Sequence, residues 1–443
     1  MVGTASPGSF FVPFGRGVRS FDLPPGVTGA VIETGIVEPL ADPPAAAQEA
    51  VLRPVLGPRL RDLATGARSV CIAVTDATRA CPDHLLVPPI LDELAAASIP
   101  SEAITILVAV GAHRASSEAE KREKLGDAIV DRYRIVDHDA TDDENLVPVM
   151  DGPGGIPFRI NRLAAEADLL LSTGLVEPHQ YAGFSGGGKT VAIGCGDEAT
   201  ISYTHGPAML DQPGVRLARL AGNPFQDAVR LVAQRANLAF VGNAVLDDNG
   251  DVVAIAYGPP TAVQDSLADL AAPLFTVAIP AQVDIAVAGV GFPKDANLYQ
   301  ASRAASYLQF APTPVVRPGG VIVIPAECPE GAGEGDGERR FLTAMSTGGG
   351  PEAVIERVRR EGIRPGEQRA YIMARVLRDV SVNIAGILEP DAARAVGFIP
   401  APTIEDALLR AAELVGTPAT ALVVPHALLT LPVVATERLA PIG

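Results

Sequence analysis

The sequence contains no tryptophan, and lysine and histidine are both rare in it. Only four of its 35 basic residues are lysines, and six of its 443 residues are histidines. The net charge is −17 at pH 7, and aromatic residues make up 5% of the chain. Such a composition argues against binding to nucleic acid or to an anionic membrane surface. The few lysines and histidines therefore carry more information than usual about where a chemical site lies.

Cysteine is also scarce, and the spacing of these residues excludes two kinds of site. Cys71, Cys81, Cys195 and Cys328 include no C-x-x-C pair, so they predict neither a disulfide framework nor a cysteine-based zinc site. The longest apolar runs, such as residues 104–110, are too short to span a bilayer. The first residues lack a basic segment followed by an apolar one, so no signal peptide is expected. We therefore expect a soluble, cytoplasmic protein with no membrane partner.

The sequence alternates regularly between strand-like and helix-like segments. Apolar, β-branched runs at 69–76 and 103–111 are each followed by a helical pattern, and a second block of this kind begins near residue 277. Apolar residues make up 48% of the chain, enough for large cores. The pattern predicts an α/β fold with two domains, 1–275 and 276–443, mostly parallel sheets, and the active site between the domains.

The strongest local signal is EPHQYAGFSGGGKT at residues 177–190. Its second half fits the phosphate-loop pattern G-x-x-x-x-G-K-[ST], in which glycine N–H groups surround a phosphate. A polar segment separates these glycines from the preceding apolar strand, unlike the context of a nucleotide triphosphatase. We expect Gly186, Gly187, Gly188 and Lys189 to form an anion or nucleotide site of another kind. A true phosphate loop and a flexible glycine turn remain the alternatives.

Two further stretches place polar side chains just after predicted strands, where ligands bind in open α/β sheets. Asp76, Thr78 and Arg79 follow the first strand and offer an acceptor, a hydroxyl and a bidentate cation. His113 and Arg114 follow the second strand, where a general base or an anion contact belongs. Taken alone, the first stretch equally fits a helix cap with a surface arginine, and the second a solvated loop.

The stretch at 292–304 opens the second domain. Gln300 and Arg303 lie three residues apart on one face of a helix predicted over 297–310, so together they could bind a carboxylate. An exposed helix face is the alternative. By contrast, Lys121 and Lys124 fall on a predicted exposed helix at 116–126 and need no function.

Three of the six histidines, His113, His179 and His205, fall in or near these stretches. Two histidines and a lysine around a glycine-rich loop indicate acid–base chemistry, with or without a metal. Three histidines would also suit a zinc hydrolase, but their spacing matches no local zinc motif and no water-activating glutamate is evident.

The ordered set of motifs resembles the lactate racemase family, which uses a nickel-pincer nucleotide. Order and approximate spacing fit over most of the chain, and the set is far more specific than any one motif. The matching segments are D-x-T-R at 76–79, H-R at 113–114, E-P-H and A-G-F-S-G-G-G-K within 177–189, His205, and L-Y-Q-x-x-R at 298–303.

The resemblance implies a role for each segment. Lys189 would hold the cofactor, with a covalent link left open, and His205 would give a ring nitrogen to nickel. His113 and His179 would be the paired acid–base groups. The cofactor nucleotide would contact the segment Asp76, Ala77, Thr78 and Arg79, and the substrate would contact Gln300, Arg303 and Arg114.

The implied reaction is racemisation or epimerisation of a 2-hydroxy acid. The hydrogen at C2 would leave as a hydride, giving a planar 2-keto acid that can receive it on either face. Two histidines on opposite sides would each take or return the hydroxyl proton of one enantiomer.

One residue departs from the family pattern and leaves the substrate open. Arg303 stands where, as we understand the family, lactate-specific members carry a lysine, and an arginine head is bulkier and binds bidentately. Lactate, malate, longer aliphatic or aromatic hydroxy acids and sugar acids are all candidates. A phosphate-loop nucleotide enzyme and a family member that binds the cofactor without turnover are the competing hypotheses. The oligomeric state is left open.

Overall fold

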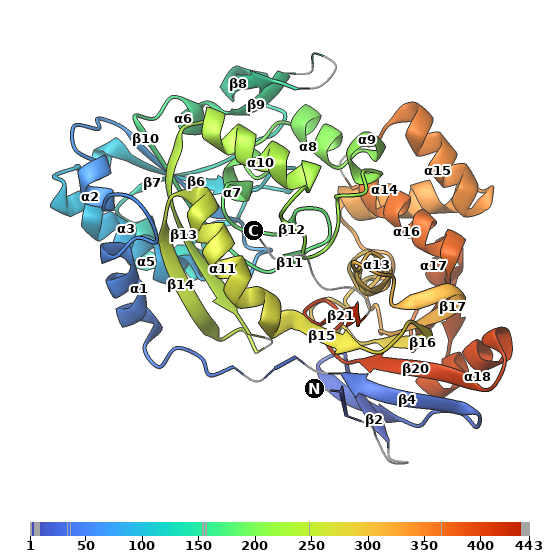
Figure 1. The fold of residues 1–443 in the computed structure, drawn as a ribbon. Coiled ribbons are helices and arrows are strands. Elements are labelled where there is room, and N and C mark those ends of the chain that lie inside the picture. The colour runs from blue at the N-terminus through green and yellow to red at the C-terminus, as the bar shows by residue number, and fades with distance from the viewer. Residues whose placement is uncertain are drawn as a thin grey trace.

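Two large β-sheets, each flanked by helices, make up the computed structural model of the chain (Figure 1). The structure describes residues 2–3, 9–32, 34–35, 37–152, 155, 157–247, 249–364 and 366–435. Within these ranges, no helix is long and apolar enough to cross a membrane.

The first sheet has six strands, which pair in parallel except where β14 runs antiparallel to β13. Strand order reverses between β5 and β10, because the chain moves outward from β5 in one direction and from β10 in the other. Ligands bind at such a switch point, beyond the carboxyl ends of the strands. In spatial order the strands are β14 Val252–Gly258, β13 Leu238–Leu246, β10 Leu169–Leu175, β5 Val70–Thr75, β6 Ile104–Ala109 and β7 Arg134–Asp137.

Helices cover both faces of this sheet, as the alternating pattern predicts. One face carries α1 Pro43–Leu52, α2 Leu60–Leu63, α3 Asp83–Ala96, α4 Glu118–Leu125 and α5 Asp127–Val130. The other carries α6 Arg162–Ala165, α7 Lys189–Ala192, α10 Pro224–Arg235 and α11 Pro260–Phe275, with α8 Glu198–Thr204 and α9 Pro207–Leu210 toward the second sheet.

The second sheet has seven strands, parallel except for the pair β1 and β4. In spatial order they are β1 Val2–Gly3, β4 Val27–Ile32, β20 Ala419–Val424, β16 Val283–Ala288, β17 Val316–Pro325, β18 Ser381–Ala385 and β19 Ile399–Ala401. Its helices are α12 Leu298–Ala301, α13 Arg303–Gln309, α14 Asp336–Ser346, α15 Gly350–Glu361, α16 Gln368–Asp379, α17 Pro390–Ala395 and α18 Ile404–Val415.

Four two-stranded sheets complete the fold. They pair β2 Phe10–Phe14 with β3 Gly17–Phe21, β8 Leu146–Asp151 with β9 Pro157–Asn161, β11 Pro178–His179 with β12 Gly183–Phe184, and β15 Thr276–Ile279 with β21 Leu431–Val434.

The beginning of the chain differs from the predicted domain division. Strand β4 pairs in parallel with β20, and β1 pairs with β4, so this part of the predicted domain 1–275 is built into the second sheet. The sequence pattern does not reveal this, because local periodicity identifies a strand but not a partner that is distant in the chain. After α11 the chain passes into β15 and the second sheet.

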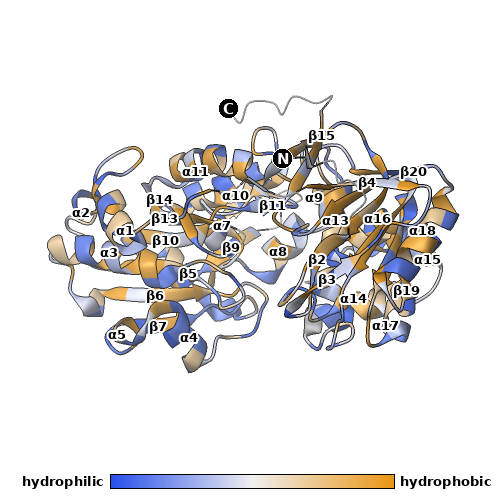
Figure 2. Cartoon of the chain, turned by 90° about the horizontal axis from the view of Figure 1, so that it is seen from below, coloured by the Kyte–Doolittle hydropathy of each residue, from blue (hydrophilic) through white to orange (hydrophobic). Residues whose placement is uncertain are grey.

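A shared hydrophobic core joins the two sheets. We call each large sheet with its helices a unit. One cluster of buried side chains includes Phe184 and Phe225 of the first unit together with Leu298 and Tyr307 of the second unit. Separate clusters lie on the remaining faces, one under α1 to α3 and one under α18. Strands are coloured mostly as hydrophobic and lie inside the helical layers (Figure 2). The chain around Phe184 therefore contributes to the core that the two sheets share.

Candidate active site

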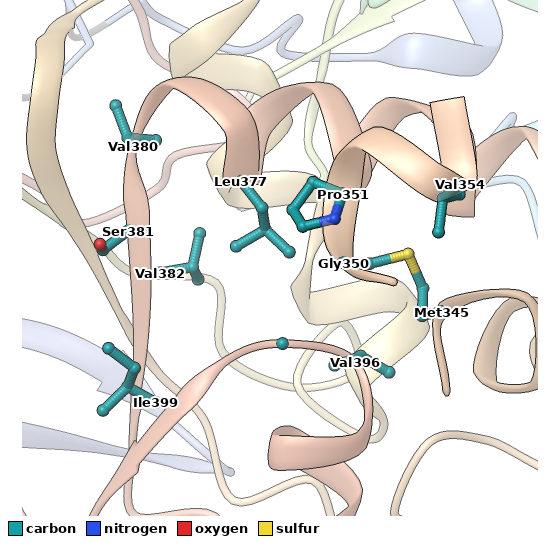
Figure 3. Close-up of a pocket in the computed structure, with 11 residues that line it drawn as sticks. Met345, Gly350, Pro351, Val354, Leu377, Val380, Ser381, Val382, Val396 and Ile399 are labelled. Carbon is teal, nitrogen blue, oxygen red and sulfur yellow. The ribbon is translucent and has the colours of Figure 1, made fainter. Parts of the chain in front are cut away.

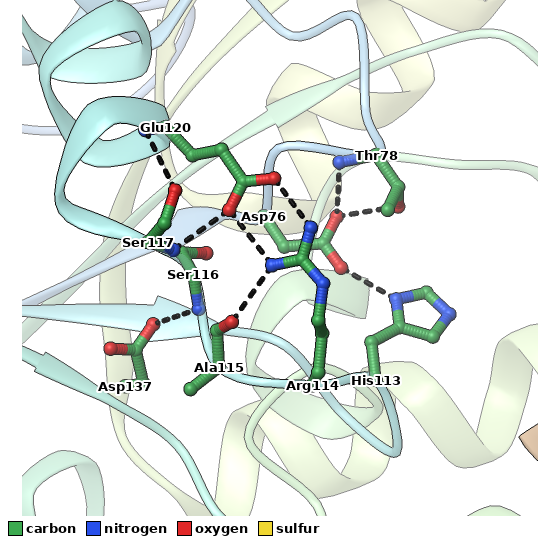
Figure 4. A network of polar contacts seen from close by, with 9 residues as sticks. All are labelled: Asp76, Thr78, His113, Arg114, Ala115, Ser116, Ser117, Glu120 and Asp137. Carbon is green, nitrogen blue, oxygen red and sulfur yellow. Dashed lines mark hydrogen bonds and ion pairs between the residues drawn. The ribbon is translucent and has the colours of Figure 1, made fainter. Parts of the chain in front are cut away.

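Asp76 and His113 meet at the carboxyl edge of the first sheet (Figure 4). Thr75, the last residue of β5, is paired with Ala109, the last residue of β6, so the residues that follow both strands lie at one edge. Nδ1 of His113 lies 2.6 Å from Oδ2 of Asp76. Oδ1 of Asp76 accepts hydrogen bonds from the Thr78 N–H, at 3.1 Å, and hydroxyl, at 2.7 Å. The predicted motifs at 76–79 and 113 thus form one unit.

The Asp76 carboxylate sets the state of the His113 ring. Burial would raise the pKa of Asp76, but the hydrogen bond and charge of His113, with the charge of Arg79, lower it to about 2. An ionised Asp76 accepts the Nδ1–H of His113, which leaves the lone pair of Nε2 free. His113 can therefore take a proton at Nε2, and Asp76 stabilises the resulting charge.

His179 is held in the opposite state. It ends β11, and its Nδ1 accepts hydrogen bonds from the backbone N–H groups of Tyr181, at 3.2 Å, and Ala182, at 3.1 Å. The neutral ring therefore carries its proton on Nε2 and donates from there. Burial, followed by the positive charge of Lys189, lowers the pKa of His179 well below its usual value. Accepting a proton at Nε2 requires this ring to move its own proton to Nδ1.

His205 is arranged as a neutral nitrogen ligand. It caps the C-terminus of α8, is 8% exposed, and its Nδ1 lies 3.0 Å from the Ile201 carbonyl oxygen. Donation of the Nδ1 proton to that oxygen leaves Nε2 unprotonated, the form that binds a metal. Burial, and then the charge of Lys189, lowers the pKa of His205 to about 3.

Two aromatic side chains that sequence reasoning missed connect the histidines. The Tyr181 ring centroid lies 5.7 Å from that of His179 and 5.5 Å from that of His205. Phe225 lies 6.2 Å and 5.2 Å from the same two rings. Tyr181 lies inside the 177–190 motif, so the motif could have indicated it as a site residue. Phe225 could not be recognised in this way, because its sequence position is typical of the core face of a helix.

Lys189 begins α7 beside these rings. Exclusion of water, followed by the charge of Arg79, lowers the pKa of Lys189 to about 7, although Glu177 and Asp76 act in the opposite direction. A lysine with such a pKa presents a large fraction of neutral amine near pH 7. Neutral amine is the form that can attack or be acylated.

The three glycines before Lys189 pack closely against neighbouring residues. The N–H of Gly187 donates to Oδ1 of Asn243 at 2.8 Å, so this donor is already used. A Cβ at Gly188 would lie 2.4 Å from the Cβ of Ala233, and one at Gly186 would lie 2.6 Å from Val176 Cγ2. The glycines are therefore required for close packing of protein against protein. Because the Gly187 N–H is already used, the arrangement argues against a phosphate loop. The contact of these glycines with a cofactor stays a prediction.

Gln300 and Arg303 lie together on the second unit, as the spacing predicts. The predicted helix over 297–310 is interrupted at Ser302, between α12 and α13. The Arg303 guanidinium lies 3.5 Å from Gln300 Oε1 and donates to the Tyr307 hydroxyl at 3.1 Å. Within the described ranges Arg303 makes no ion pair with a carboxylate. It is thus free to bind an anion.

The charges of the two units act on each other at this site. Arg303 lowers the pKa of His179 and of Lys189, and Arg79 of the first unit lowers that of Lys294 of the second. Burial, with these charges, brings the pKa of Lys294 to about 8. The predicted groups of the first unit therefore lie within electrostatic reach of those of the second.

Arg114 does not join this group. Its guanidinium donates to both carboxylate oxygens of Glu120, at 2.6 and 2.8 Å, and its side chain is 73% exposed. Glu120 is fixed there because it completes a capping box with Ser117 at the start of α4 (Figure 4). The structure thus gives Arg114 a surface ion pair, and its contact with the substrate stays a prediction.

Other arrangements considered from the sequence find no support in the described part of the chain. No three histidine, cysteine, aspartate or glutamate side chains gather there as metal ligands, which argues against a zinc hydrolase. A cavity of about 170 Å³ lies between α15, α16 and β18, lined by apolar side chains such as Val354, Leu377 and Val382 (Figure 3). None of the predicted site residues lines it.

Comparison with known proteins identifies the family. The profile of the lactate racemase N-terminal domain matches residues 14–218, and that of the C-terminal domain matches residues 277–431. The chain belongs to the lactate racemase family. It is thereby an isomerase of the racemase type, and the family assignment inferred from the motifs is confirmed.

Individual relatives agree with this assignment. The chain is 32% identical to a lactate racemase of Thermoanaerobacterium thermosaccharolyticum over 83% of its length and 85% of the relative. It is also 32% identical to a lactate racemase of Lactiplantibacillus plantarum, over 85% and 87%. The solved lactate racemase apoprotein of the first organism superposes with a TM-score of 0.86 at 28% identity, covering 96% of this chain and all of that one. A protein from Thermotoga maritima, at 19% identity and a TM-score of 0.67, shares the fold; that match covers 91% of this chain and all of the other.

Proposed function

We propose that the protein interconverts the enantiomers or epimers of a 2-hydroxy acid through a 2-keto acid. One observation supports this most: acid–base, ligand and carboxylate-binding side chains of both units converge on one site. Arg303, with Gln300 beside it, would bind the substrate carboxylate. His113 and His179 would exchange protons with the substrate hydroxyl.

A nickel-pincer nucleotide is the cofactor that we propose, and three side chains fit it. His205 has a free Nε2 for nickel, because its Nδ1 proton is donated to Ile201. Lys189, with a pKa of about 7, offers an amine that could hold the cofactor covalently. Arg79, exposed and without an ion pair to any described carboxylate, would bind the nucleotide phosphate. When bound, this group supplies an acceptor for the C2 hydrogen as hydride.

The two histidines would serve the two enantiomers. His113 is ready to accept the hydroxyl proton at Nε2, with Asp76 behind it. His179 is set as a donor at Nε2 and would hydrogen-bond to the substrate oxygen. With its own proton moved to Nδ1, the ring would take the hydroxyl proton at Nε2 and later return that same proton. Acceptor and donor states on two sides of a substrate are what proton transfer in both directions requires.

The test is racemisation by the holoenzyme in D₂O, followed by chiral chromatography and mass spectrometry across a panel of 2-hydroxy acids. Hydride transfer predicts that hydrogen at C2 is retained while the optical activity is lost. Incorporation of deuterium at C2 in step with racemisation would mean direct proton removal. No racemisation of any panel member by enzyme that carries the nickel-pincer nucleotide would refute the proposal.

Variants of the two histidines test their roles. His113→Asn and His179→Asn should each lower kcat for racemisation at least 100-fold, since general acid–base catalysis contributes about 10²–10⁴. Each should still form 2-keto acid in a single turnover from one enantiomer but not from the other. The control is His84→Asn, at an exposed histidine, with kcat within twofold of wild type. Equal loss of the half-reaction with both enantiomers would contradict the division of labour.

A further inference from the structure

A buried polar link crosses from the first unit to the second beside His179. Gln180 Oε1 lies 3.0 Å from Ser306 Oγ, and Nη1 of Arg369 donates to the same hydroxyl at 3.0 Å. Gln180 follows β11, Ser306 lies in α13 and Arg369 in α16. All three residues are buried, with Gln180 4%, Ser306 0% and Arg369 7% exposed.

In the described part of the chain, Ser306 is the only hydrogen-bond partner of both neighbouring side chains. Within the described ranges, the side chains of Gln180 and Arg369 each make a single hydrogen bond, and both bonds are to Ser306. Gln180 Nε2 and Arg369 Nε are buried without a partner, and Arg369 makes no ion pair with a described carboxylate. A buried arginine without a counter-charge is costly, so its position demands a reason other than stability.

The neighbours of the link supply that reason. The Ser306 hydroxyl also lies 2.9 Å from the carbonyl oxygen of Arg303, the residue proposed to bind the substrate carboxylate. The Arg369 guanidinium lies 5.7 Å from the Tyr299 ring centroid, next to Gln300 in the chain. On the first unit, Gln180 lies in the chain between His179 and the residues Tyr181 and Ala182. The backbone N–H groups of those two residues fix the His179 ring.

We propose that Ser306, supported by Arg369, is a positioning residue that holds the 179–182 turn through Gln180 and so sets the orientation of His179. The helix that carries Arg303 would thereby align the acid–base group with the bound carboxylate. This inference rests on the proposed function and adds a part to it. Ser306 and Arg369 touch neither reactant; they act through Gln180 and His179.

The first test is hydrogen–deuterium exchange of the apoprotein, followed by mass spectrometry of peptides covering 177–184. Ser306→Ala removes only the hydroxyl, and loss of a buried hydrogen bond should speed exchange of the Tyr181 and Ala182 amides about fivefold. Ser302→Ala is the matched control, because Ser302 is equally buried but its hydroxyl donates to Tyr299 of its own helix segment. Unchanged exchange in Ser306→Ala would overturn the proposal.

A second variant approaches the link from the other unit. Gln180→Ala should speed the same amides to the same degree, and the double variant Gln180→Ala/Ser306→Ala should exchange no faster than either single variant. Additive effects would mean that the two side chains act separately. Circular dichroism and the thermal midpoint show whether each variant is folded, and Gln180→Ala keeps the test valid if Ser306→Ala does not fold.

Kinetics separate positioning from substrate binding. In the holoenzyme, Ser306→Ala should lower kcat about fivefold and leave the KM of the 2-hydroxy acid within twofold, since Arg303 remains in place. A raised KM with unchanged kcat would overturn the proposal. If wild-type enzyme does not racemise any substrate but exchange still responds as expected, the proposed function fails and the anchoring of the turn stands.

Discussion

Among single residues, Lys189 differs strongly from an ordinary lysine. An ammonium group in water has a pKa near 10.5, whereas the surroundings of Lys189 lower it to about 7. The group thus binds fewer protons in the folded chain than in the unfolded chain between about pH 7 and 10.5. Its contribution to the free energy of unfolding therefore rises with pH across this window.

Competitive amine labelling tests this shift. In the apoprotein, acylation of Lys189 by acetic anhydride should reach half of its maximum rate near pH 7, because only the neutral amine reacts. With four lysines in the chain, peptide mapping separates their rates. The unfolded chain is the control, and there Lys189 should titrate near its ordinary value. A midpoint near pH 10 in the folded protein would show that Lys189 keeps its proton at neutral pH.

Among the elements, helix α4 contacts the loop that follows β5, although its polar sequence predicts only an exposed helix. Lys124 was expected to be exposed and without function, but its side chain is 12% exposed. Its ammonium donates to the carbonyl oxygens of Arg79 and Cys81, both at 2.7 Å, and lies 3.1 Å from Oδ2 of Asp83. Lys121 is likewise paired, with Asp137. Helix α4 therefore fixes the loop that carries Asp76 and Arg79.

Replacing Lys124 tests this support. Lys124→Met should lower the free energy of unfolding by about 3 kcal/mol, because it leaves the fully buried Asp83 without its ion pair. Arg122→Met on the same helix is the control; this more exposed arginine pairs with Asp131, and we expect a loss under about 1 kcal/mol. Urea unfolding measures both. Equal losses would mean that Lys124 is an ordinary surface cation.

These elements show what local patterns can and cannot supply. The strand predicted over 69–76 is β5, and Asp76 meets His113 because parallel strands end at one edge of a sheet. The close packing of Gly188 against Ala233 was not predicted, because a phosphate contact and a tight helix contact both require glycine. The burial of Lys124 and the break at Ser302 depend on tertiary contacts, which sequence periodicity does not record.

At the scale of the whole molecule, a second polar contact joins the two units. Asp211, after α9, accepts from the Tyr371 hydroxyl at 2.6 Å and pairs with Arg359 at 2.9 Å and Arg375 at 3.3 Å. These three partners come from α15 and α16. Together with the link at Ser306, the cluster ties the active-site half of the first unit to the second.

Loss of the Asp211 charge should loosen the two units. Asp211→Asn is expected to lower the free energy of unfolding by roughly 2 kcal/mol, the scale of a charged hydrogen bond. The radius of gyration from small-angle X-ray scattering should rise as the units separate more often. Asp143→Asn is the control, since among the described residues Asp143 pairs only with Arg159 of its own unit, and its side chain is 79% exposed. If the radius of gyration is unchanged in both variants, the apolar core alone holds the two units together.

The position of β4 has a consequence for synthesis of the chain. The ribosome makes this strand almost four hundred residues before its partner β20. In the meantime, the six strands of the first sheet can assemble. During this time the edge of β4 that later pairs with β20 has no partner strand. The nascent protein therefore has a long interval in which this strand can pair with other chains, and a chaperone that shields β4 would protect the yield of folded enzyme.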